Sequence, residues 1–106
     1  MSVLTSLPEW KKLSELAATV KDAHMRDWFA QDANRADKMQ LEACGIFLDY
    51  SKNRVNDDAL KGLFDLARAC KLETLRDAMF SGEQINSTEG RAVLHTALRN
   101  FSDRKV

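Results

Sequence analysis

The chain has 106 residues, of which 44% are hydrophobic and 30% charged, a composition typical of one small globular domain. A single domain of this length should bury about 65% of its unfolded surface. Its 16 basic and 16 acidic residues cancel to a formal net charge of zero. Without a net field to attract phosphates or anionic lipids, we expect no nucleic-acid partner and no membrane partner.

The N-terminus lacks the basic start and apolar core of a signal peptide, and no apolar run approaches the ~20 residues of a membrane span. We therefore expect a cytoplasmic protein. Cys44 and Cys70 show no Cys-x-x-Cys spacing. They are expected to be reduced, buried thiols and not part of a disulfide framework.

Two helices are predicted at the start of the chain. Ser6 is the expected N-cap of a helix over residues 7–21, with Pro8 in its first turn. Apolar residues recur at helical spacing along this helix, so it should be amphipathic. A second, short helix is expected over 23–30, and the polar run 31–38 indicates a loop or one more short turn.

The hydrophobic period changes after this polar run. Apolar and polar residues alternate on both sides of Cys44 and Gly45, which predicts a β-hairpin over residues 39–54. A two-stranded hairpin is marginally stable on its own in water. It must therefore pack on the helices or join a larger sheet.

Three further helices are predicted in the second half, over residues 57–70, 73–80 and 88–99. Asn56 can cap the first of them, and Gly82 can end the second in the left-handed conformation. Polar residues before the third can accept its free amide groups. The predicted fold class is mainly α with a β-hairpin (α+β).

The titratable residues do not form a recognisable catalytic pattern. His24 and His95 are expected to be structural, and with the two cysteines they share no metal-ligand spacing. Lys52 and Arg54 could contact a phosphate, but the four glycines form no phosphate-binding loop, and local salt bridges of Asp49 and Arg54 are favoured. We predict no catalytic, cofactor-binding or metal-binding residue.

Two longer runs carry a resemblance to a known family. Residues 79–100 read Met-Phe-Ser-Gly-Glu-Gln-Ile-Asn-Ser-Thr-Glu-Gly-Arg-Ala-Val-Leu-His-Thr-Ala-Leu-Arg-Asn. This run closely resembles a hallmark of the N-terminal region of the phosphoglucose isomerase family. The run Phe47–Arg54, Phe-Leu-Asp-Tyr-Ser-Lys-Asn-Arg, resembles a second motif of that family, in the same order. Weaker agreement extends the resemblance over about residues 10 to 100.

The resemblance implies a role in an enzyme that interconverts glucose 6-phosphate and fructose 6-phosphate in glycolysis and gluconeogenesis. It implies a cytoplasmic homodimer that acts on a sugar phosphate without a metal or organic cofactor. Family members are longer α/β/α sandwich enzymes, and their catalytic groups lie downstream of both motifs. Residues 1–106 are thus expected to be a single N-terminal segment with a structural role.

Two expectations follow for the chain on its own. It should lack isomerase activity, and it should expose apolar surface through which it can self-associate. The alternative is a standalone helical protein-interaction module without enzymatic activity, which would bind a partner helix through its Trp10 or Leu60 face.

Overall fold

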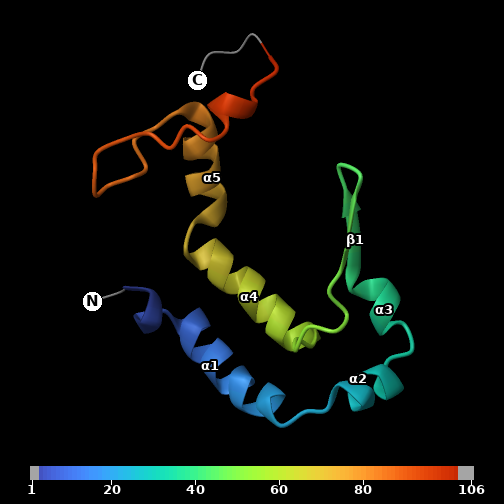
Figure 1. Ribbon diagram of the computed structural model, residues 1–106. Helices are drawn as coiled ribbons and strands as arrows, with labels where there is room; N and C mark the ends of the chain where they lie inside the picture. The colour runs from blue at the N-terminus through green and yellow to red at the C-terminus, as the bar shows by residue number, and fades with distance from the viewer. Residues whose placement is uncertain (1–2, 103–106) are drawn as a thin grey trace. The chain divides into compact units, whose positions relative to one another are not determined.

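A computed structural model describes residues 3–102 of the chain, and Figure 1 shows its elements in chain order. The described elements are η1 (Val3–Ser6), α1 (Pro8–Lys21), α2 (Met25–Gln31), α3 (Arg35–Lys38), β1 (Gln40–Ala43), β2 (Ile46–Asp49), α4 (Asp57–Ala69), α5 (Leu72–Ser81) and η2 (Ala97–Arg99). The mainly α fold class with one β-hairpin is confirmed. The chain divides into two compact units, Met1–Leu66 and Ala67–Val106.

The first helix begins one residue later than predicted and without the predicted cap. Leu7 is the N-cap of α1 and makes no side-chain capping bond. The Ser6 hydroxyl instead donates to the Val3 carbonyl at 2.6 Å, inside η1. Pro8 needs no acceptor for an N–H and has its φ fixed near the helical value, so the first turn forms without a side-chain cap.

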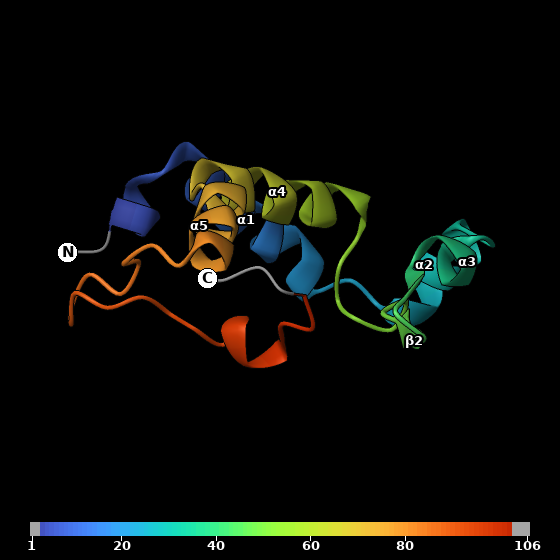
Figure 2. The ribbon, with the colours of Figure 1, turned by 90° about the horizontal axis from the view of Figure 1, so that it is seen from above.

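Within the first unit, α1 and α4 lie side by side, as Figure 1 and Figure 2 both show. Small residues make this contact possible, because Ala59 and Gly62 are the buried residues of α4. A Cβ added at Gly62 would lie 2.9 Å from Leu13 Cδ2 and 3.5 Å from Leu16 Cδ1. The two helices are therefore in close contact at this position.

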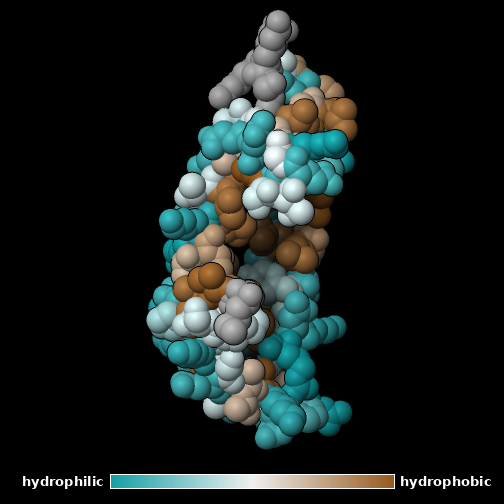
Figure 3. Space-filling view, turned by 90° about the vertical axis from the view of Figure 1, so that its left-hand side faces the viewer, coloured by the Kyte–Doolittle hydropathy of each residue, from teal (hydrophilic) through white to brown (hydrophobic). Residues whose placement is uncertain are grey.

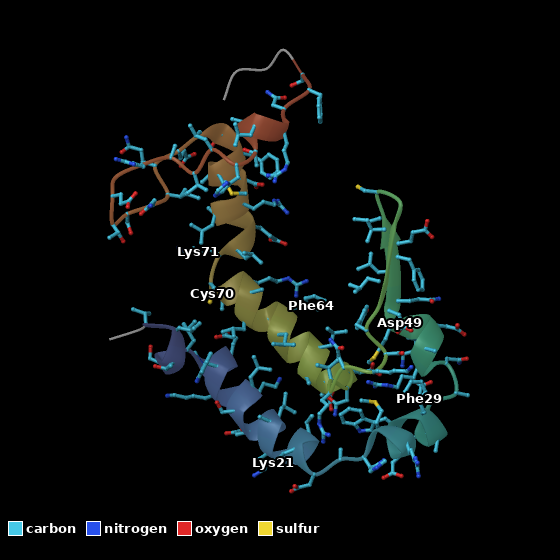
Figure 4. The ribbon with its side chains drawn as sticks, in the orientation of Figure 1. Lys21, Phe29, Asp49, Phe64, Cys70 and Lys71 are labelled. Carbon is cyan, nitrogen blue, oxygen red and sulfur yellow. The ribbon has the colours of Figure 1, made fainter. Side chains whose placement is uncertain are left out.

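The large apolar residues of α4 do not share this burial. Leu63 is 45% exposed and Phe64, labelled in Figure 4, is 54% exposed. Among the described residues, the buried hydrophobic side chains are those of Met39 and Ala59. Figure 3 shows apolar side chains, in brown, reaching the surface on the face it displays. The expected exposed apolar surface is present, and the core of residues 3–102 is small.

The hairpin forms where the sequence predicted it, with a shorter second arm. β1 and β2 pair antiparallel, and the strands end at Asp49, so residues 50–54 of the predicted hairpin lie outside the ladder. Cys44 and Gly45 have φ values of +53° and +75°, which is the backbone of a two-residue type I′ turn. This turn leaves Cys44 exposed, and Cys70 is exposed after the end of α4. The prediction of two buried thiols is therefore wrong.

In the second unit, the predicted break between α4 and α5 is present. Lys71 takes the left-handed conformation with φ +56°, which ends one helix before the next begins. Gly82, at φ +80°, caps α5, and the Glu83 N–H donates to the Ala78 carbonyl at 3.0 Å. Lys71 and Gly82 both take the left-handed conformation in which helices commonly end.

The helix predicted over residues 88–99 is wrong. Asn86 and Arg91 exchange two backbone hydrogen bonds of 3.1 and 3.2 Å around a tight turn, and only Ala97–Arg99 form a short 3-10 helix. The Asn86 side chain does accept the Glu89 N–H, at 3.2 Å, as a helix cap would. Gly90 then takes φ +63°, which turns the chain back and prevents helix propagation.

The close α1–α4 contact predicts that Gly62→Leu destabilises the chain. A side chain at this position must displace Leu13, and overpacking of this kind costs about 1–3 kcal/mol, more than the gain of up to about 1 kcal/mol in helix propensity. Urea denaturation measures the change in the free energy of unfolding.

The matched control is Lys61→Leu on the exposed side of the same helix, where the side chain is 69% exposed. It loses an (i, i+4) ion pair worth about 0.3–0.5 kcal/mol. Equal effects of the two leucine substitutions would contradict the proposed role of Gly62.

Candidate functional site

The most tightly organised site in the described residues is the loop between β2 and α4, residues 50–56. It is held by Arg35, which lies on α3 and is 4% exposed. Its Nε donates to the Ser51 carbonyl at 2.9 Å, and its Nη2 donates to the carbonyls of Asn53 and Val55 at 3.0 and 2.9 Å. One guanidinium group thus satisfies three carbonyl oxygens of a single loop.

Two aromatic residues from α2 surround the same guanidinium group. The Arg35 Cζ atom lies 4.9 Å from the centroid of the Trp28 ring and 5.6 Å from that of Phe29. A cation near an aromatic face is stabilised by the ring quadrupole, more strongly when water is excluded. The predicted polar run 31–38 therefore contains a short helix whose arginine is packed inside the unit.

The start of the loop is fixed by Asp49, at the end of β2 (Figure 4). Its Oδ1 accepts the Ser51 N–H at 2.9 Å, and Ser51 is 2% exposed. The side-chain hydrogen bond from Ser51, followed by the backbone one, lowers the pKa of Asp49. The Asp49 carboxylate stays ionised at neutral pH and stabilises the turn by accepting the Ser51 N–H.

Arg54 connects the loop to the end of α1. Its Nη2 donates to the carbonyls of Val20, Lys21 and Ala23 at 3.3, 2.9 and 2.8 Å. Helix C-termini carry unsatisfied carbonyls and partial negative charge, so a guanidinium group is well suited to cap them. The predicted salt bridges of Asp49 and Arg54 are wrong, because both side chains bond to backbone instead.

On the exposed side of the unit, Lys38 of α3 forms ion pairs with Asp32, at the end of α2, and with Asp57, at the start of α4. Lys38 Nζ lies 2.6 Å from an Asp32 oxygen and 3.1 Å from an Asp57 oxygen. The hydrogen bond from Lys38, followed by that from the Asn34 backbone, lowers the pKa of Asp32. Bonds to Asp32 and then Asp57 raise the pKa of Lys38. Asp32 and Asp57 thus share the positive charge of Lys38 at the surface.

The two histidines lie apart from this loop's contacts. His24 is the N-cap of α2, and its Nδ1 accepts the Arg26 N–H at 3.1 Å, a structural role. His95 is exposed in the second unit, outside any α-helix, so its predicted place in an apolar helix is wrong. Within residues 3–102, no group of three or more His, Cys, Asp or Glu side chains could hold a metal ion.

An apolar groove runs between α1 and α4. One hollow of about 340 Å³ is lined by Leu13, Leu16, Ala17, Val20, Lys21, Arg54, Ala59 and Leu63. A second, of about 240 Å³, shares Leu13, Ala17 and Leu63 and extends to Trp10. Trp10 thus lies at one end of the space between the two helices. No helix in the described part of the chain is long and apolar enough to cross a membrane.

Sequence reasoning missed Arg35, the residue that organises the site. Its partners are backbone carbonyls 16 to 20 residues away, so no pairing of charged side chains marks it in the sequence. Acidic and polar neighbours make it look like part of a solvated loop. The one usable signal is the aromatic pair at Trp28 and Phe29, which offers a cation a place to pack.

The chain matches a family of isomerases, in agreement with the two motifs. The family model described as phosphoglucose isomerase matches residues 49–106, more than half of the chain. The chain belongs to the phosphoglucose isomerase family.

Its relatives are considerably longer than this chain. It is 92% identical over all 106 residues to the glucose-6-phosphate isomerase of Alteromonas mediterranea, of which it covers 19%. It is 58% identical to the enzyme of the same name from Pseudoalteromonas atlantica, again covering 19%, and 54% identical to that of Deinococcus radiodurans, covering 20%. The chain thus spans about a fifth of their length, and the alternative of a standalone interaction module is not favoured.

The contacts of Arg35 predict a large loss of stability for Arg35→Met. The substitution leaves three carbonyl oxygens without their donor. Each carbonyl that water does not reach costs about 1–3 kcal/mol. We therefore expect the free energy of unfolding to fall by about 3 kcal/mol or more. Arg35→Lys should recover only part of this loss, because an ammonium group lacks the planar fork. Urea denaturation measures both variants.

Arg26→Met is the control, since Arg26 is exposed on the neighbouring helix α2. A surface substitution of this type should change the free energy of unfolding by no more than about 0.5 kcal/mol. If Arg35→Met were as mild as Arg26→Met, the three hydrogen bonds would not be what holds the loop.

Proposed function

We propose that this chain is the N-terminal segment of a glucose-6-phosphate isomerase and that its role there is structural. The observation that carries the proposal is the family match over residues 49–106, together with 92% identity along the whole chain to a relative of that name. The parent enzyme acts on a sugar phosphate and interconverts glucose 6-phosphate and fructose 6-phosphate.

The reaction needs a base of suitable pKa, and two carboxylates of this chain are shifted away from that range. An aldose–ketose isomerisation moves a proton between C2 and C1, which requires a base with a pKa near the working pH. The pKa values of Asp32 and Asp49 are lowered by their hydrogen bonds, which is the opposite direction from a base tuned toward neutrality. Both carboxylates serve turns and ion pairs. From the family resemblance we infer that the catalytic groups belong to the rest of the parent polypeptide.

The surroundings of the parent follow from the same assignment. We place it in the cytoplasm as a homodimer that needs no metal or organic cofactor. The apolar groove between α1 and α4, with Leu63 45% exposed, is then a surface that the parent covers. When this chain is alone, the same surface promotes self-association.

The central prediction is that the 106-residue chain has no isomerase activity, while the full-length parent converts fructose 6-phosphate to glucose 6-phosphate. Both proteins should be made in a host whose own isomerase gene is deleted, because traces of that enzyme would imitate turnover. Glucose 6-phosphate formation is followed with a coupled dehydrogenase. The full-length relative from Alteromonas mediterranea is the positive control.

Turnover by the short chain above the background of the deleted host would overturn the structural role. An inactive full-length parent, measured beside an active relative, would overturn the assignment to this activity. A reading frame that stops directly after Val106 would favour the interaction module instead.

A second prediction concerns the exposed apolar surface. Sedimentation of the chain alone should show association that rises with concentration, and a dye that binds apolar surface should fluoresce. Phe64→Lys should weaken both signals, since it places a charge on the exposed face of α4. A monomer at all concentrations with no dye binding would contradict self-association.

A further inference from the structure

The pairing of the hairpin separates its side chains into two chemically different faces. In the register, Leu41 pairs with Leu48 and Ala43 pairs with Ile46. Successive residues of a strand point to opposite sides, so these four residues share one face, here called the apolar hairpin face. The opposite face carries Gln40, Glu42, Phe47 and Asp49.

The apolar hairpin face has no cover within the described part of the first unit. Leu41 and Leu48 are each 50% exposed and Ile46 is 70% exposed, and every residue of both strands is exposed. Figure 4 shows side chains standing out from both sides of the hairpin ribbon. A two-stranded hairpin is marginal on its own. One wholly apolar face, with an opposite face that is polar except for Phe47, is the pattern of a sheet packed on one side only.

A second copy of the chain is a poor cover for this face. Two such faces packed together would bury on the order of 700 Å², below the roughly 1,200 Å² of a specific stable interface. The hairpin edges offer no better alternative, because the polar face carries Glu42 and Asp49 with no basic side chain in either strand. Two copies paired edge to edge would bring like charges together.

The polypeptide beyond this chain is a better cover. The chain spans only 19% of the length of the 92% identical relative, so a large body of protein is available in the parent. A covalently linked segment docks without the entropy cost of bringing two molecules together, so a small apolar face is sufficient.

We propose that the apolar hairpin face, Leu41, Ala43, Ile46 and Leu48, is the docking surface for an apolar layer of the parent's remaining polypeptide. The opposite face, with Glu42 and Asp49, remains in water. This inference rests on the proposed function, since that function supplies the longer parent.

Cysteine labelling in the full-length parent tests the two faces directly. Ile46→Cys and Phe47→Cys are neighbours in one strand on opposite faces, and both are made in a Cys44→Ser background so that no other thiol lies in the hairpin. Labelling by a water-soluble maleimide is measured on the hairpin peptide by mass spectrometry. We expect Cys at position 46 to react at least tenfold more slowly than Cys at position 47.

Stability supplies a second measurement that does not depend on a reactive thiol. Leu48→Ser should lower the Tm of the full-length parent by at least about 3 °C, while Phe47→Ser should leave it within about 1 °C. Trypsin cleavage at Lys52 should be faster in the Leu48→Ser protein only. If Leu48→Ser failed to fold, the labelling pair would still decide.

Equal labelling rates at positions 46 and 47 would overturn the inference. Protection at position 46 that disappears on dilution would also overturn it, because a second copy would then be the cover. The isomerase assay on the same full-length protein keeps the two claims apart. An active enzyme with equal labelling at the two positions would contradict the docking surface alone. An inactive protein that is protected at position 46 would contradict the proposed activity alone.

Discussion

The guanidinium group of Arg35 is the constraint on which the first unit depends. It holds three carbonyls of the loop that leaves the hairpin and enters α4. Directly after this loop, the Asn56 side chain accepts the Ala59 N–H at 2.8 Å and starts the helix as a cap. Arg54, inside the loop, closes the end of α1. Four elements thus meet at one irregular segment, and two arginines replace the hydrophobic core that this segment lacks.

Both arginines bond to backbone carbonyls and neither to a carboxylate in these contacts. A carbonyl oxygen is a fixed acceptor, and several can be arranged around one planar fork without burying a second charge. The motif Phe47–Arg54 that carries part of the family resemblance is therefore used here to build a junction. A highly specific sequence motif can thus encode a backbone turn and the donors that hold it.

Local signals predicted most of the elements, and long-range contacts account for what was missed. Asn56 and Gly82 marked helix ends correctly, because caps act within a few residues. The same reasoning failed at Asn86, where an equally good capping bond forms a turn that Gly90 completes. Ser6 failed for a related reason, since its hydroxyl found a nearer acceptor. Arg35 was missed because its hydrogen-bond partners lie 16 to 20 residues away, and only the aromatic pair at Trp28 and Phe29 indicates where it packs.

The largest difference between sequence and structure concerns burial, and it has a physical meaning. Helical periodicity placed Leu63 and Phe64 on the apolar stripe of α4, yet in this chain the buried positions are Ala59 and Gly62. The periodicity of apolar residues predicts which face of a helix is buried in the complete protein. It does not predict which part of the polypeptide packs on that face. Small residues lie where this chain packs most closely on itself, and the larger Leu63 and Phe64 stay about half exposed. This distribution suits a segment spanning 19% of a longer relative, since one helix then packs on α1 through its small residues and keeps apolar surface for the remainder.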